Sequence, residues 1–598
     1  MRQRAAGPRE RGRPGRCTGV AEAGQAGETP ALPGRCAANT APSARRIASF
    51  VALALWLGVA LGLPAAPAAG QTPPPTADAT ADNPIVRENQ LPGSRDWQRP
   101  NPPKHASTGA TSAESEAQGS VEQGIASWEP PLISGYVDRV SVAPGDTLGL
   151  YVSTTASTFD LAVSRMGWYG GQGGRLLHSA YGLPGLDQPI PPPDPATGLV
   201  AVNWQLSYSI PIGRDWPSGI YLVRLLANTA DLDVGYAVFV VRDDAQAADY
   251  VYKVAVNTYQ AYNNWGGKSL YPYNSVGGPA VKVSFDRPYD QWDGAGAFFD
   301  WDFPMIRWLE REGYNVSYVA DTDAHADTRY LAGRRVLISA GHDEYWSKEM
   351  RDSWEAARDQ GYALAFFGGN AVYWQVRYEP SASGGANPVL VCYKDADRDP
   401  LRGVDDSRVT VRWRSPPVNR PENALLGVMS EGVISWGGDF PYVVADASHW
   451  LYEGTGAVPG QAWSRIIGYE YDRVYDNGAT PPALAVLSNS PLVNVQNTAS
   501  VANAAYHQQG GMVFAAGTVD WAWALDDVRV PDRVDPRIQR MTANVLRVFR
   551  DGEPPEAPAP PGSARPLFFG LAVGAFAVAL AAGWAAWALR RPAAQAYE

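Results

Sequence analysis

Cysteine is nearly absent from this sequence. Only Cys17, Cys36 and Cys392 occur in 598 residues, and the first two lie in a basic stretch at the start of the chain. A single thiol in the body of the chain cannot form an internal disulfide, and a CxxC metal site is excluded. Cys392 lies in the apolar run Val-Leu-Val-Cys-Tyr, which is typical of a small core residue.

Positive charge is also scarce outside the first residues. The formal net charge is −11, yet residues 1–46 hold nine arginines against three glutamates. The remainder therefore carries about −17, and such an acidic body argues against nucleic acid as a partner.

Aromatic residues are abundant, with 21 tryptophans. A chain of this length is too long for one typical domain, so we expect two folded domains with accessory segments. Tryptophan-rich chains build large aromatic cores or bind flat apolar or sugar-like ligands, and composition leaves both open.

The first 128 residues have the pattern of an export signal followed by a linker. Residues 1–70 form a basic extension in which Arg45-Arg46 precede the apolar run Ile47 to Leu63, with small residues near Ala68. This pattern predicts a signal peptide, either cleaved near Ala68 or retained as an anchor. Residues 71–128 are rich in Pro, Thr, Ser and Ala, which predicts a disordered linker.

Two patterns follow in order. Residues 129–243 contain short alternating strands with turn signals such as Pro144-Gly-Asp146, which favours a β-sandwich, immunoglobulin-like in the loose sense. Residues 244–550 alternate strands with helices, for example the strand Val336 to Ser339 and the helix Lys348 to Gln360 with Ser347 as its N-cap. This alternation predicts an α/β domain with a mostly parallel sheet.

The end of the chain suggests a membrane anchor. Residues 551–565 form a proline-rich stalk, and residues 566–590 contain the uncharged run Leu567 to Leu589, which is long enough to span a bilayer. Arg590-Arg591 follow, and residues 591–598 form a short tail. By the positive-inside rule, we expect a single-pass protein of the cell membrane with its domains outside the cytoplasm.

Polar side chains follow two of the predicted strands. His342 and Glu344 come directly after Val336 to Ser339, and the loop of residues 257–271 follows the strand Val251 to Val256. Ligands of open α/β sheets bind at the carboxyl ends of strands, so the two loops could converge on one crevice. The structural alternative is that both loops are only hydrogen-bonded to stabilise the fold.

Several motifs occur in a characteristic order. They are Gly-Trp-Tyr-Gly-Gly (167–171), Trp-Pro-Ser-Gly-Ile-Tyr (216–221), Thr-Tyr-Gln-Ala-Tyr-Asn (258–263), Asp-Arg-Pro-Tyr (286–289), Gly-His-Asp-Glu-Tyr-Trp (341–346) and Gly-Tyr-Glu-Tyr-Asp (468–472). Over about residues 130–550 the chain resembles the large subunit of N,N-dimethylformamidase. The resemblance implies a sandwich followed by a glutamine-amidotransferase-like α/β domain, a mononuclear iron ion held by two tyrosines and a glutamate, and hydrolysis of a small amide.

Carried over residue by residue, the resemblance makes Tyr221, Tyr262 and Glu344 the metal ligands. It places His342 beside the metal and makes Glu470 the catalytic glutamate, while Tyr259 competes for the place of the second tyrosine. Phenolate and carboxylate oxygens suit a hard cation such as Fe(III). His342 would take a proton from water or orient it, and Glu470 would protonate the leaving amine.

Two functions remain open at this stage. The first is a membrane-anchored, extracytoplasmic, iron-dependent hydrolase that acts on a small amide. Such an enzyme could form a homo-oligomer. The second is an inactive surface protein that holds a glycan or peptide on the same scaffold. A tyrosine in a Gly-Ile-Tyr-Leu strand is more often a core residue than a ligand, and Glu470 could be an ordinary ion-pair partner.

Overall fold

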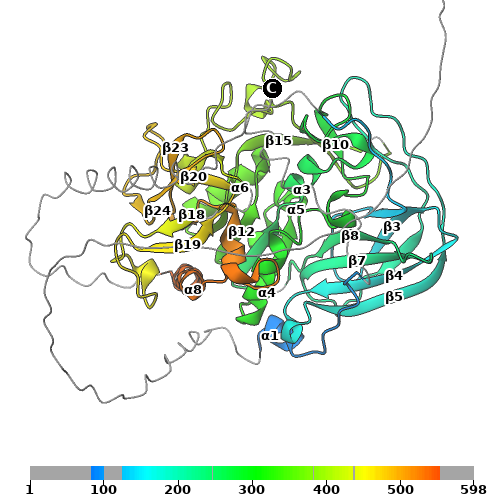
Figure 1. Cartoon of the computed structure of the whole chain (residues 1–598), viewed down its shortest axis with the longest axis horizontal. Coiled ribbons are helices and arrows are strands. Elements are labelled where there is room, and N and C mark those ends of the chain that lie inside the picture. Colours follow the sequence, from blue (N-terminus) through cyan, green and yellow to red (C-terminus); the bar gives the residue numbers. More distant parts are fainter. Residues whose placement is uncertain are drawn as a thin grey trace, which may run out of the picture. The chain divides into compact units, whose positions relative to one another are not determined.

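A computed structural model of the chain describes residues 82–99, 124–245, 247–381, 383–435, 438 and 440–552 (Figure 1). The predicted export signal, the predicted transmembrane segment 566–590 and the tail 591–598 lie outside these residues, as does all but the first two residues of the predicted stalk.

A sandwich of two sheets comes first in the chain. One sheet has the order β1-β3-β6, and the other has the order β2-β8-β7-β4-β5. Alternate residues of both sheets, such as Leu150, Val223 and Phe239, point into one shared apolar core. Their bounds are β1 Ile133–Val137, β2 Ser141–Val142, β3 Thr147–Thr154, β4 Thr158–Met166, β5 Gly174–Pro184, β6 Tyr208–Pro211, β7 Gly219–Ala227 and β8 Val234–Val241.

The largest sheet follows, with the order β11-β9-β12-β14-β25-β24-β21. Its strands from β11 to β25 are parallel, whereas β24 and β21 pair antiparallel. The bounds are β9 Tyr250–Val254, β11 Val316–Ala320, β12 Val336–His342, β14 Ala363–Gly369, β21 Ala485–Val486, β24 Ala505–Gln509 and β25 Gly511–Ala515.

Helices cover both faces of this sheet. On one face Ile338 and Phe367 pack in the same core as α4 and α8, and on the other face Leu337 and Phe366 pack with α6. A strand covered on both faces is apolar without alternation, which is why β12 and β14 read as continuous apolar runs. The α-helices are α1 Pro84–Asn89, α3 Val256–Tyr262, α4 Asp302–Arg311, α5 Asp321–Ala326, α6 Lys348–Asp359, α7 Asn423–Leu426 and α8 Pro536–Asp551.

Four smaller sheets complete the described chain. Their orders are β10-β16-β15-β13, β17-β20, β18-β19 and β22-β23. The bounds are β10 Lys282–Ser284, β13 Tyr345–Ser347, β15 Trp374–Glu379, β16 Val389–Val391, β17 Met429–Val433, β18 Phe440–Val443, β19 Ala462–Ile467, β20 Glu470–Arg473, β22 Ser490–Val493 and β23 Ala499–Ala502.

The predicted fold class is therefore wrong as a whole. The sequence predicted one sandwich, one mostly parallel sheet and a C-terminal transmembrane helix, whereas the described residues form seven sheets, three of which combine parallel and antiparallel pairs. The four smaller sheets were missed because their strands have three to six residues, too few to establish a period-2 pattern.

The predicted single-pass membrane location is contradicted as well. Within the described ranges, every helix is too short or too polar to cross a bilayer. The longest of them, α8, has sixteen residues and a polar face with several arginines, against the roughly 20 apolar residues that a span requires.

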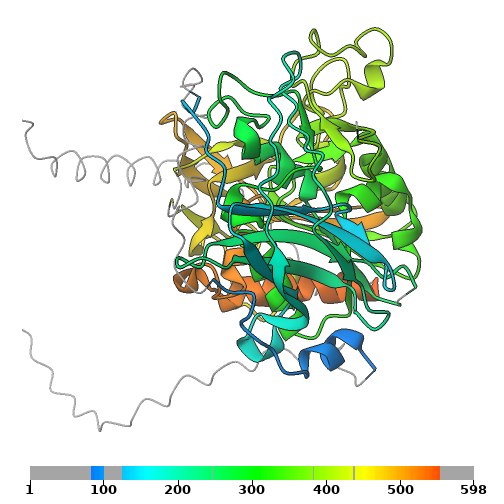
Figure 2. The same cartoon turned by 90° about the vertical axis from the view of Figure 1, so that its right-hand side faces the viewer.

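Part of the predicted linker is ordered. Asn83 caps α1 by accepting a hydrogen bond from the Ile85 amide, and its Nδ2 donates to the carbonyl oxygen of Gly313 at 2.7 Å. Trp97 is buried and donates to the carbonyl oxygen of Gln172. Figure 2 shows α1 in blue beside the 3₁₀ turn η1 (Tyr169–Gly171). Composition alone missed this segment because a few buried side chains were enough to hold it.

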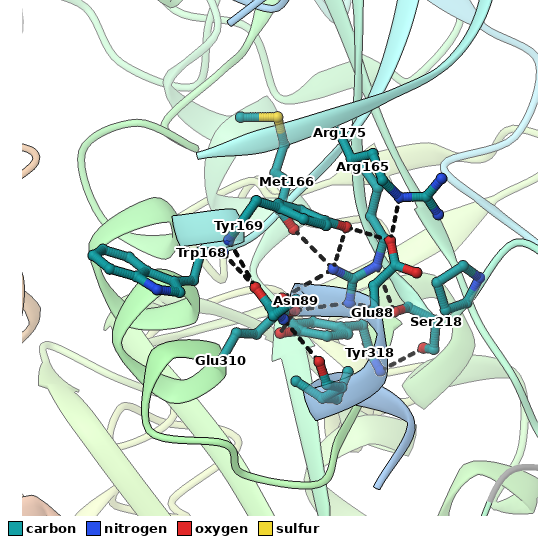
Figure 3. Close-up of polar contacts among 12 residues, drawn as sticks. Glu88, Asn89, Arg165, Met166, Trp168, Tyr169, Arg175, Ser218, Glu310 and Tyr318 are labelled. Atoms are coloured by element: carbon teal, nitrogen blue, oxygen red, sulfur yellow. Dashed lines mark hydrogen bonds and ion pairs between the residues drawn. The ribbon is translucent and has the colours of Figure 1, made fainter. Parts of the chain in front are cut away.

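A buried ion pair joins the sandwich to the large sheet (Figure 3). Arg165 of β4 donates two hydrogen bonds to Glu310 of α4, at 2.7 and 2.9 Å, and both side chains have 0% exposure. Tyr318 of β11 and Asn89 of α1 also donate to the Glu310 carboxylate, each at 2.8 Å. Helix α1, strand β4 and the adjacent elements α4 and β11, which come from three separate parts of the sequence, therefore meet at one carboxylate.

Glu310→Gln is predicted to lower the free energy of unfolding by about 3–5 kcal/mol, because it leaves the Arg165 charge buried without its counter-ion. The matched control is Glu453→Gln, since Glu453 forms an exposed pair with Arg547, and a loss below about 1 kcal/mol is expected there. Urea denaturation measures both. Equal, small losses in the two variants would show that the buried pair does not hold the fold.

Candidate functional site

Two neighbouring parallel strands carry the candidate site at their carboxyl ends. The strand β9 is followed directly by α3, whose last residue is Tyr262, and β12 ends at His342. The backbone amide of Glu344 donates to Thr258 Oγ of α3 at 3.0 Å, which ties the two segments together. The predicted convergence of the two loops is thus present in the structure.

Glu344 is the centre of the site and is only 3% exposed. Tyr262 donates its hydroxyl to Glu344 Oε2 at 2.9 Å, and the Tyr271 hydroxyl lies 3.1–3.2 Å from both carboxylate oxygens. Burial raises the pKa of Glu344, opposed by the charge of His342. Burial and the facing Glu344 carboxylate hold the pKa of Tyr262 well above its usual range.

His342 lies between two carboxylates. Its Nε2 is 2.8 Å from Glu470 Oε2 and 3.4 Å from Glu344 Oε2. This contact is an ion pair when the imidazole is protonated, and within the described residues Nε2 has no partner in hydrogen-bond geometry. Burial by itself would lower the pKa of His342, but the carboxylates, Glu470 above all, raise it to about 9.

The structure brings Tyr262, His342, Glu344 and Glu470 together, but it does not bring Tyr221 to them. Tyr221 alternates with Val223 along β7, so its ring points into the core between the two sheets of the sandwich. There it stacks on Trp216 and donates its hydroxyl to the carbonyl oxygen of Pro217 at 2.7 Å. The ligand role carried over to Tyr221 is therefore corrected.

Tyr259, the competing choice, is directed away from Glu344 as well. Its hydroxyl donates to Asp302 Oδ2, and Tyr252 donates to the other oxygen of the same carboxylate. Burial raises the pKa of Asp302 to about 7, although both tyrosine hydrogen bonds oppose the shift. Tyr259 therefore anchors α3 to Asp302 of α4 and does not face the site.

Two residues at the site were missed from the sequence. Tyr271 ends the aromatic loop that begins at Asn257, but nothing in the sequence separated it from the other tyrosines there. Lys394 places its Nζ 3.3 Å from the centroid of the Tyr271 ring and 4.9 Å from that of Trp374. A lysine after a short strand carries no motif, so its place at the site depends on tertiary structure alone.

An aromatic wall borders the site on the side of His342. Trp301 and Trp523 stack at 5.1 Å, and Trp301 also lies against Tyr469. The Tyr469 hydroxyl is 3.4 Å from His342 Nδ1. These rings exclude water from the charged groups, which strengthens the electrostatic interactions between them.

The oxygen donors fit a hard metal ion. In the described part of the chain, His, Cys, Asp and Glu side chains alone form no group of three or more that could hold a metal. Tyr262 and Tyr271, however, direct two phenol oxygens at the Glu344 carboxylate within 3.2 Å. Phenolate and carboxylate oxygens are the ligands that a trivalent ion such as Fe(III) favours.

Comparison with known proteins gives one consistent similarity. The family described as "N,N-dimethylformamidase beta subunit-like, C-terminal" matches residues 160–535. The N,N-dimethylformamidase beta subunits of Alcaligenes sp and Paracoccus aminophilus are 22% and 21% identical over 311 and 310 residues. Each alignment covers 42% of this chain and 38% of the relative, so the chain matches well under half the length of those proteins.

Among solved structures, a cycloisomaltooligosaccharide glucanotransferase of Paenibacillus sp. aligns at 13% identity over 46% of this chain and 35% of that chain. The TM-score of this alignment is 0.13, which is too low to support a statement about fold or function.

Tyr221→Phe is predicted to act on stability alone. It removes one hydrogen bond in the sandwich core and should lower the free energy of unfolding by about 1 kcal/mol. Urea denaturation measures the loss, and a crystal structure of the variant should show the Tyr262–Glu344 contact unchanged. Displacement of Glu344 in that variant would reinstate Tyr221 as part of the site.

Proposed function

The chain belongs to the N,N-dimethylformamidase beta subunit-like family, and from this membership we propose that it hydrolyses the C–N bond of a small amide. The observation that carries the proposal is the buried cluster in which Tyr262, Tyr271 and His342 all face Glu344, with Glu470 behind His342. A protein that only bound a ligand would have no need to bury two carboxylates against one imidazole, because such burial costs stability.

One proton shared by His342 and Glu470 suffices for the reaction. When that proton is on Glu470, His342 Nε2 accepts a proton from the attacking water, and Glu470 gives its own to the leaving nitrogen. When it is on His342, the two roles are exchanged. In both cases the pair accepts one proton and releases one, as hydrolysis of an amide to an acid and an amine requires.

Tyr262, Tyr271 and Glu344 are the residues proposed to hold the metal ion. A bound trivalent ion such as Fe(III) supplies Lewis acidity at this position. The two phenols must lose their protons to serve as ligands, and the Lys394 ammonium on the face of the Tyr271 ring favours the anionic form of that tyrosine.

The burial of the site favours a small substrate. Glu344 and His342 are 3% and 4% exposed, and the wall of Trp301 and Trp523 stands beside them. A bulky amide would have to displace these packed rings, whereas a small one needs only local movement. The low exposure also keeps bulk water away from the charges during proton transfer.

Metal analysis of the full chain after expression with added iron tests the metal proposal. We expect one iron per chain and a visible phenolate-to-iron absorption band. Tyr262→Phe and Tyr271→Phe should each weaken or remove the band, because each deletes one phenolate ligand. Tyr221→Phe is the matched control and should keep it. A colourless protein without metal would contradict the proposal.

Glu470→Gln tests the proton-transfer role. The amide side chain keeps the size of the group but cannot accept or release the proton, so kcat should fall by about 10²–10⁴-fold. Release of amine from a panel of small amides measures the rate, and the iron content should stay at the wild-type level. A variant that retains full activity would exclude Glu470 from the mechanism.

A further inference from the structure

Asn370 has an uncommon backbone conformation at the edge of the site. It directly follows β14, and its φ is +49°, in the left-handed region that favours glycine. Residues other than glycine occupy this region at a cost, and asparagine is among the few that occupy it in single positions. Such strain persists where surrounding contacts enforce it, and it is concentrated at functional sites.

Two contacts hold Asn370 in this conformation. Its backbone amide donates to Asp472 Oδ1 at 2.8 Å, and its side-chain Nδ2 donates to Glu470 Oε2 at 2.9 Å. Glu470 and Asp472 are two residues apart in β20 and therefore point to the same side of that strand. One strained residue thus binds both acidic side chains of this strand.

The other side-chain atom of Asn370 shows what this arrangement costs. Asn370 is 6% exposed, and its Oδ1 has no hydrogen-bond partner among the residues that the structure describes. Rotating the amide by 180° would not help, because Oδ1 would then face the Glu470 carboxylate, and two acceptors repel. The side chain therefore donates to Glu470 while one of its buried oxygens has no partner among the described residues.

We propose that Asn370 is a positioning residue that aims the Glu470 carboxylate at His342. This inference deepens the proposed function, since the role of Glu470 in proton transfer belongs to that proposal. The hydrogen bond from Nδ2 occupies Glu470 Oε2, the same oxygen that lies 2.8 Å from His342 Nε2. Without this donor, the carboxylate can rotate away from the imidazole.

A second residue of this loop at positive φ also contacts the backbone of the site. Val372 also has a positive φ, of +57°, and its amide donates to the carbonyl oxygen of Asp343 at 3.0 Å. The amides of Tyr373 and Trp374 both donate to the carbonyl oxygen of Glu344 at 2.9 Å. These three hydrogen bonds hold the peptide groups before and after Glu344. The loop after β14 therefore positions Glu344 through Val372, Tyr373 and Trp374, and Glu470 through Asn370.

Asn370→Gly separates positioning from a purely structural role. Glycine occupies the left-handed region without strain and keeps the backbone amide, but it removes the Nδ2 donor. We expect the urea midpoint of the full chain to stay equal or rise, while kcat falls about 10–100-fold with the iron content unchanged. A purely structural role predicts the opposite, a lower midpoint and an unchanged kcat.

Asn497→Gly is the matched control. Asn497 has a φ of +57° in the exposed turn between β22 and β23, away from Glu470 in the chain. Its replacement should raise the urea midpoint in the same way and leave kcat unchanged. Asn370→Asp is a second variant. Aspartate also occupies the left-handed region, but its carboxylate lies against that of Glu470, so kcat should fall in this variant as well.

Crystal structures of the wild type and of Asn370→Gly provide a readout that needs no substrate. We expect Glu470 in one rotamer facing His342 in the wild type, and in a second or mixed rotamer in the variant. An unchanged Glu470 in the variant overturns the inference, even if the chain hydrolyses no amide. A displaced Glu470 in a chain without amidase activity supports the inference and refutes the proposed function alone.

Discussion

The buried pair of Arg165 and Glu310 is the constraint on which the site depends. Two charges at 0% exposure persist only when they are paired, so this contact fixes α4 against the sandwich. Asp302, in the first turn of α4, binds the hydroxyls of Tyr252 and Tyr259, and Tyr259 belongs to the helix that presents Tyr262. The position of Tyr262 is therefore coupled to an ion pair that lies outside the site.

A second buried network holds the strand ends together. Lys253 of β9 binds Asp321, which begins α5 after β11, and Asp343, which follows β12. These three strands are neighbours in the large sheet, so one ammonium group joins three adjacent carboxyl ends. Asp343 lies between His342 and Glu344 in the chain, and the network thereby limits the movement of both.

The site concentrates costs that the rest of the fold must offset. It buries His342 with two carboxylates, leaves the Oδ1 of Asn370 without a hydrogen-bond partner among the described residues, and keeps Asn370 and Val372 at positive φ. Each of these features lowers stability, and each persists because rigid strands and helices surround it. Groups held in this way need little rearrangement when a substrate reaches them, which is the condition that catalysis favours.

How far sequence reasoning reached differs from residue to residue. The strand Val336 to Ser339, the cap Ser347 and the helix after it were readable because they depend on local patterns, and the ordered motifs identified the family and placed His342, Glu344 and Tyr262 in one site. The smaller sheets and α1 were missed, since their strands and turns are too short for a pattern to form. Tyr221 lies in the sandwich core, whereas Tyr271 and Lys394 lie at the site. Which aromatic or basic side chain contacts Glu344 depends on how strands that are distant in the sequence pack together. Spacing along the chain does not determine that packing.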